Sequence, residues 1–92
     1  MITRLVKMNF QKEDIPDFLE VFTANKNLIA SFEGCESVEL RRDLNSTTIF
    51  FTISKWRSVE DLENDRNSEL FKSVWSKTKI LFAEKAEAWT LE

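Results

Sequence analysis

The sequence predicts an α+β protein with the ferredoxin-like arrangement, a four-stranded antiparallel sheet with helices on one face. Three observations predict it. Strand-like and helix-like segments follow one another in the order β-α-β-β-α-β, with the second helical region broken in two. There is no linker, repeat or low-complexity stretch. The length of 92 residues suits one domain, residues 1–92.

The first strand and first helix are marked by a change of hydrophobic period. Residues 2–10 alternate, and the more apolar face carries Ile2, Arg4, Val6, Met8 and Phe10. Helical spacing then takes over at Ile15, Phe18, Leu19, Phe22, Ile29 and Phe32. Asp14 is expected to cap this helix, with Pro16 in its first turn. Gly34 is placed to end it in a left-handed conformation.

A hairpin and two short helices follow. Residues 38–41 and 47–56 are expected to pair as strands around the turn-forming sequence 43–46. Ser58, with an acid three residues later, predicts a helix start. A break is expected at 64–68. Helical spacing then returns at Leu70, Phe71, Val74, Trp75 and Thr78. Residues 80–91 are expected to form the closing strand.

The strand at 47–56 is apolar on both faces, although the open face of such a sheet should be polar. Ile49, Phe51 and Ile53 share one face, whereas Phe50 and Trp56 lie on the other. The last strand adds Trp89 and Leu91. Two exposed aromatic side chains on so small a monomer would leave a large apolar patch. We therefore expect a homodimer that packs sheet to sheet, the alternative being that twist or the C-terminal segment covers the patch.

Composition excludes several functional classes. The sequence contains no His, so Ser-His-Asp catalysis and His-ligated zinc or haem are excluded. A single Gly excludes glycine-rich phosphate loops, and a single Cys excludes an internal disulfide. The net charge of −3 argues against nucleic-acid binding. No apolar run is long enough to cross a membrane and the N-terminus does not resemble a signal peptide, so a cytoplasmic location is expected.

The ordered motifs along the chain resemble those of the antibiotic biosynthesis monooxygenase family. They are Glu33-Gly34-Cys35, Arg42-Asp43, Trp56, Ser58-x-Glu60-x-Leu62 and Ser68-x-x-Phe71. This resemblance covers essentially the whole chain and implies a dimeric α/β barrel. Some relatives oxidise quinols or polycyclic aromatics with O₂ and without metal or flavin, whereas others degrade haem.

The chain departs from the family pattern at three positions. Asp65 stands where many relatives have a His, and Trp75 stands where the haem-degrading relatives have their ligand His. Thr52 is the nearest candidate for the Asn used by quinol-oxidising relatives, and it supplies no amide. The absence of His removes the axial ligand for haem. Neither a cofactor nor a metal is therefore expected.

Asp65 and Trp56 are the candidate catalytic residues. A carboxylate held beside aromatic rings would have a raised pKa and could accept a proton from a phenol. The alternative is a solvated Asp at a helix break. The Trp56 indole could stack on a flat substrate and donate a hydrogen bond to an oxygenated intermediate, or it could serve only to fill the core.

Phe22, Phe51, Phe71 and Trp75 are the candidate substrate-binding residues. They could line a cleft between helices and sheet that suits a small aromatic or apolar ligand, or they could form the core itself. Two functions remain open on the sequence alone. The first is cofactor-independent oxidation of a quinol-like substrate with O₂, and the second is a non-catalytic dimer that binds an apolar ligand or a partner protein.

Overall fold

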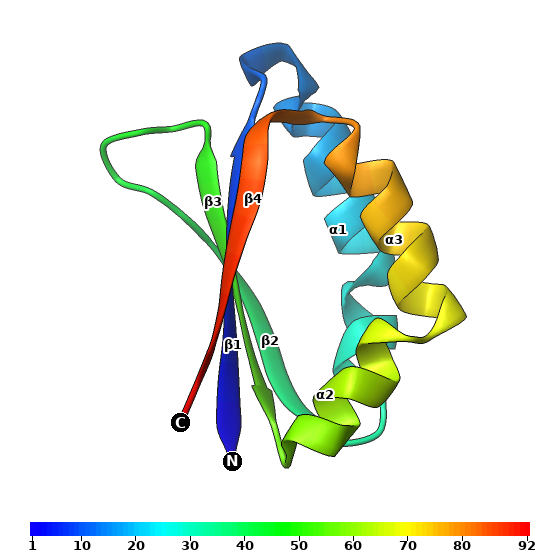
Figure 1. Ribbon diagram of the computed structural model, residues 1–92. Helices are drawn as coiled ribbons and strands as arrows, with labels where there is room; N and C mark the ends of the chain where they lie inside the picture. The colour runs from blue at the N-terminus through cyan, green and yellow to red at the C-terminus, as the bar shows by residue number, and fades with distance from the viewer.

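The computed structural model describes all 92 residues as one sheet covered on one face by helices (Figure 1). The elements are β1 (Ile2–Phe10), a 3₁₀ turn (Lys12–Asp14), α1 (Ile15–Ala30), β2 (Cys35–Arg42), β3 (Ile49–Trp56), α2 (Val59–Arg66), α3 (Glu69–Lys79) and β4 (Phe82–Leu91). The sheet order is β2-β3-β1-β4, and every neighbouring pair is antiparallel. The predicted fold class and element order are confirmed.

The ends of the helices follow two of the three end signals in the sequence. Gly34 adopts the expected left-handed conformation, with φ of 86°. The Ser58 side chain accepts a hydrogen bond from the Asp61 backbone N–H at 3.2 Å, which caps α2. The prediction that Asp14 caps α1 is wrong, because this residue ends the 3₁₀ turn in helical geometry and its side chain makes no capping hydrogen bond.

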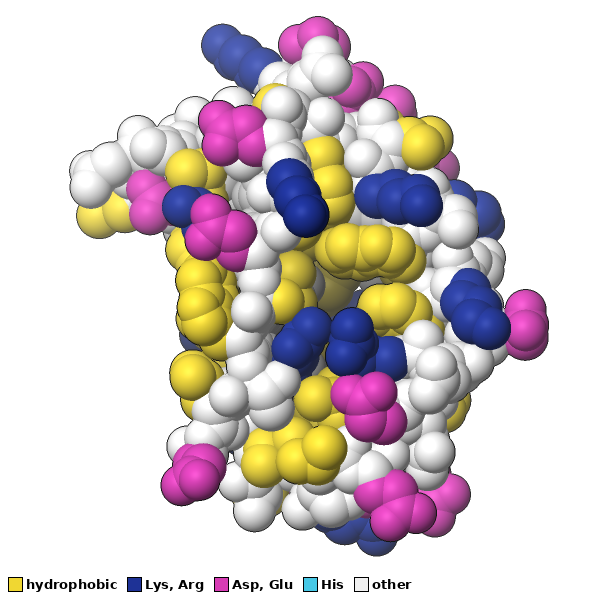
Figure 2. All heavy atoms as spheres, viewed as in Figure 1, with side chains coloured by type: hydrophobic (Ala, Val, Ile, Leu, Met, Phe, Trp, Pro, Cys, Tyr) yellow, Lys and Arg dark blue, Asp and Glu magenta, His cyan; other side chains and the backbone are white.

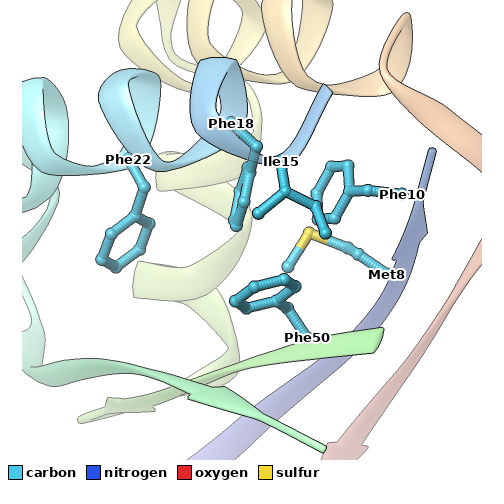
Figure 3. Packing of buried hydrophobic residues seen from close by; sticks show 6 residues of the cluster. All are labelled: Met8, Phe10, Ile15, Phe18, Phe22 and Phe50. Carbon is cyan, nitrogen blue, oxygen red and sulfur yellow. The ribbon is translucent and has the colours of Figure 1, made fainter. Parts of the chain in front are cut away.

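The core lies where α1 crosses β1 and β3. It contains Met8, Phe10, Ile15, Phe18, Phe22 and Phe50, whose side chains converge between helix and sheet (Figure 3). The rings of Phe10 and Phe18 stack with centroids 4.1 Å apart, and Phe50 meets both of them edge-on. This packing anchors α1 and leaves the space under α2 and α3 less completely filled.

The register of β3 overturns one expectation from the sequence. Met8 pairs with Phe50 and Ile2 with Trp56, so Phe50 and Trp56 face the helices and are buried. They are not the exposed aromatic pair. The open face instead carries Ile49, Phe51 and Ile53.

The open face nevertheless carries one apolar row that crosses three strands. One row of cross-strand neighbours runs from Ile53 on β3 through Leu5 on β1 to Trp89 on β4. Phe51 belongs to the row on one side of it, and Leu91 belongs to the row on the other side. Trp89 is 41% exposed and Leu91 46% exposed. The open face therefore still carries exposed apolar side chains, although they are not Phe50 and Trp56.

Candidate functional site

A cavity of about 280 Å³ lies between the helical layer and the sheet. Fourteen of its twenty lining residues are hydrophobic, and they come from all three α-helices and all four strands. Figure 2 shows a hollow with apolar walls that opens between β4 and the α2–α3 side of the molecule. A cavity of roughly 150 Å³ can hold benzene, so this one has room for one or two fused aromatic rings.

The aromatic walls come mainly from α3. The rings of Phe71 and Trp75 stack with centroids 5.9 Å apart and planes 11° from parallel. Both line the cavity, because positions 71, 74, 75 and 78 form the inner face of this amphipathic helix. Phe22 of α1 also lines it. The structure thus brings these three predicted residues together.

Phe51 is the predicted cleft residue that the structure places elsewhere. It is absent from the cavity lining, since its pairing partner Lys7 lies on the open face of the sheet. Side chains alternate along a strand, so the neighbours Phe50 and Thr52 take the helix-facing positions. Thr52 lines the cavity in its place.

Trp56 closes the cavity at one end of β3. It is 1% exposed, and its ring packs edge-on against Phe32 with centroids 6.4 Å apart. Its indole N–H donates to the Ser54 hydroxyl at 2.9 Å. In this conformation the ring forms a wall, and the Ser54 hydroxyl keeps its own proton to donate toward the cavity.

Asp65 is buried against the cavity at 6% exposure. It lies three residues after the buried Leu62, so the two share the inner face of α2. Ser68 fixes the break that follows, because its hydroxyl donates to the Asp65 carbonyl and accepts from the Phe71 N–H. The interpretation of Asp65 as a solvated break residue is therefore wrong.

The Asp65 carboxyl has no partner within the chain. The carboxyl makes no side-chain hydrogen bond and no ion pair. The one side-chain hydrogen bond to Asp65 goes from the Ser68 hydroxyl to its backbone carbonyl. Burial raises its pKa from 3.8 to about 6, and the positive charge of Arg66 opposes that rise. Arrangements of this kind, a cavity with a carboxyl of raised pKa, are suited to general base catalysis.

The thiol of Cys35 lies near this carboxyl but is poorly suited to reaction. Burial raises its pKa first, and the charge of Asp65 raises it further. Its Sγ donates to the Ser37 carbonyl at 3.6 Å. A thiol held protonated is a weak nucleophile, so Cys35 is a packing residue here.

Five polar lining residues are not among the site residues predicted from the sequence: Arg4, Thr52, Ser54, Arg66 and Thr78. The sequence does distinguish Arg4, because it is the only charged residue on the apolar face of the first strand. Thr52 and Ser54 likewise share a strand face with Phe50 and Trp56.

No group of three or more His, Cys, Asp or Glu side chains is arranged to hold a metal ion. No helix has the length and apolar character needed to cross a bilayer.

Comparison with solved structures shows the same fold at low sequence identity. A conserved protein from Methanosarcina mazei is 17% identical with a TM-score of 0.93, covering 100% of this chain and 92% of its own. A protein from Mycobacterium tuberculosis is 13% identical with a TM-score of 0.90, covering 99% and 92%. A structure named antibiotic biosynthesis monooxygenase is 14% identical with a TM-score of 0.93, covering 100% and 97%.

The family is shown by the sequence rather than by these neighbours. No curated protein matches the chain. A family model described as antibiotic biosynthesis monooxygenase matches residues 1–75, which span β1 to most of α3 and include Trp56 and Asp65. The chain therefore belongs to the antibiotic biosynthesis monooxygenase family.

Proposed function

We propose that this protein oxidises a small electron-rich aromatic substrate of the quinol type with O₂, without a cofactor, and that Asp65 is the base. The observation that carries the proposal is the buried carboxyl of Asp65, which faces an apolar cavity and has no partner in the chain. No side-chain oxygen of the chain is both fully buried and unpartnered, so the Asp65 carboxyl oxygens are open to the cavity, where a ligand proton could reach them.

The first step is removal of a phenolic proton. A flat ring would lie between the Phe71–Trp75 wall and the sheet, with its hydroxyl toward Asp65. A carboxylate with a pKa of about 6 is a stronger base than an ordinary Asp. The difference between its pKa and that of a phenol, which is near 10, is therefore smaller. The surrounding apolar side chains exclude water and strengthen this interaction.

The remaining steps involve only substrate and O₂. The phenolate transfers one electron to O₂, and the resulting radical pair joins to form a C–O bond and a ring peroxide. Asp65 returns its proton to the peroxide. The oxygenated ring carbon then loses its C–H proton as the O–O bond breaks, so that one oxygen stays on the ring as a carbonyl and the other leaves as hydroxide, which takes up that proton to become water. A hydroquinone and O₂ thus become a hydroxyquinone and water, so atoms and electrons balance.

We further propose that the protein acts as a homodimer formed through the open sheet face. The apolar row Ile53–Leu5–Trp89 supports this, because a small monomer rarely leaves such a patch uncovered. Replacing Phe51 by Asp should give a monomer in sedimentation-velocity experiments. The control is Leu44→Asp, since Leu44 is 93% exposed in the hairpin turn. A wild-type protein that sediments as a monomer would contradict this proposal.

Oxygen consumption tests the catalytic proposal. Purified protein is mixed with hydroquinones, naphthoquinols and anthrones, and the rate is compared with protein-free autoxidation. Asp65→Asn keeps the size of the side chain and removes the base, so it should lower the enzymatic rate about 10²-fold or more. Glu60→Gln, an exposed carboxyl on the same helix, is the matched control.

Two results would count against the proposal. Uptake that is unchanged in Asp65→Asn would leave an oxidase with a different mechanism. Binding of these aromatics without oxygen uptake would favour the alternative function, a non-catalytic module for apolar ligands.

A further inference from the structure

The mouth of the cavity carries two arginines that the proposed chemistry does not use. Arg4 reaches it from β1 and Arg66 from the last turn of α2. Ala88 of β4 also lines the cavity and is exposed, so the opening lies on this side. Figure 2 shows basic side chains flanking the hollow.

Arg4 is incompletely paired. One of its N–H groups donates to the Thr90 hydroxyl at 2.8 Å across the β1–β4 ladder. It takes part in none of the four ion pairs of the chain, which leaves four of its five donors without a partner in the protein. Burial, followed by the nearby charge of Arg66, lowers its pKa.

Of the two arginines at the mouth, only Arg66 takes part in an ion pair. Arg66 pairs with Glu63 at 3.2 Å, and both side chains are about half exposed. Arg4 and Arg66 together bring two positive charges, and Glu63 and Asp65 bring two negative charges at a pH above the Asp65 pKa of about 6. Asp65 lies deeper, and Arg66 is the charged group that acts on it. Arg4 is therefore the arginine at the rim of the apolar cavity that makes no ion pair within the chain.

We infer that Arg4, with Arg66, binds a carboxylate carried by the aromatic ligand, so that the ligand class is a hydroxyaryl carboxylic acid. The guanidinium fork matches a carboxylate geometrically, and such charge-assisted pairs are stronger than neutral hydrogen bonds. The ring lies in the apolar cavity, the carboxylate at the rim and the phenol deeper, toward Asp65. This inference rests on the proposed function, since it assumes that the cavity takes the aromatic ring.

A matched pair of ligands tests the inference without turnover. Calorimetry would compare 6-hydroxy-2-naphthoate with 6-hydroxy-2-naphthamide, which has the same shape and no charge. The wild-type protein should bind the carboxylate about tenfold more tightly than the amide. This preference should shrink as salt is raised, because both arginines reach solvent.

Variants assign the preference to residues. Arg4→Met should abolish the carboxylate preference, and Arg66→Met should reduce it. Arg4→Lys should retain part of it through charge alone. Lys72→Met changes the net charge equally on the outer side of α3 and should leave the preference intact. Thr90→Val removes the strand-to-strand hydrogen bond of Arg4 but keeps its charge, so it separates a structural role from ligand binding.

The outcomes separate this inference from the proposed function. Equal binding of both ligands would overturn the carboxylate site and leave aromatic binding intact. A preference that survives Arg4→Met in protein that still unfolds cooperatively would also overturn it. Failure of both ligands to bind would overturn it too, while oxygen uptake with neutral quinols would decide the proposed function independently.

Discussion

The substitution Asp65→Asn tests whether the cavity carboxyl is held at an energetic cost. The side chain is 6% exposed and has no partner, and burial raises its pKa from 3.8 to about 6. That rise corresponds to about 3 kcal/mol against the ionised form in the folded state. The carboxyl faces the cavity, where water lowers the cost, and the Asn amide is itself buried. We therefore expect the variant to be about 1–2 kcal/mol more stable at pH 7.

The raised pKa of Asp65 determines how the stability difference between Asp65→Asn and the wild type changes with pH. Below about pH 4 the carboxyl is protonated in both states, so it contributes no penalty. Between about 4 and 6 the folded state keeps the proton that the unfolded state has released, so stability falls as pH rises. Above 6 the penalty is complete. The advantage of Asp65→Asn should therefore be absent near pH 3.5, grow through this window and become constant above it.

Urea unfolding followed by Trp fluorescence at fixed protein concentration would measure the effect. Glu60→Gln on the exposed side of α2 should follow the wild-type pH profile with a small constant offset. The reasoning is refuted if Asp65→Asn is less stable than the wild type at pH 7 and equally so at every pH. That result would mean that the carboxylate is stabilised by its surroundings.

Two further substitutions test the local structure around the site. Gly34→Ala should lose about 1–3 kcal/mol in urea unfolding, because a residue with φ of 86° is strained and the added Cβ would collide with the Asp61 side chain. Equal stability of Gly34→Ala and wild type would contradict a left-handed turn at this position. Ser68→Ala should lose about 1 kcal/mol through the missing cap of α3, whereas Ser73→Ala on the exposed face of that helix should be nearly neutral. Similar losses in the two serine variants would argue against capping as the cause.

The order of the elements could be predicted from the sequence because each one has its own hydrophobic period and end signal. The faces of β3 could not. Phe50 and Phe51 are adjacent, and both faces of the strand are apolar, so alternation alone does not say which side faces the helices. Pairing with Met8 on β1 decides it, and that contact joins two segments that lie far apart in the chain.

The candidate site residues could be named from the sequence, but their burial could not be predicted from it. Asp65 is the candidate base on the sequence alone, yet its neighbours Arg66 and Asn67 are typical of a solvated turn. Its burial comes from its place on the inner face of α2, just before the break at which Ser68 bonds the Asp65 carbonyl and the Phe71 N–H. Arg4 is visible in the sequence as a charge on an apolar strand face, but only the fold shows that this face ends at a cavity mouth.

The central strand β1 has a consequence for how binding events influence one another. Consecutive residues point to opposite sides, so Leu5 lies on the open face while Val6 lines the cavity, and Trp89 and Ala88 repeat this on β4. A partner packed on the open face would contact β1 and β4, the same two strands whose opposite face lines the cavity. Linkage then requires that, if association changes ligand affinity by some factor, the ligand changes the association constant by that same factor. Ligand affinity would then depend on protein concentration, and a saturating aromatic ligand would shift the monomer–dimer equilibrium without touching the interface.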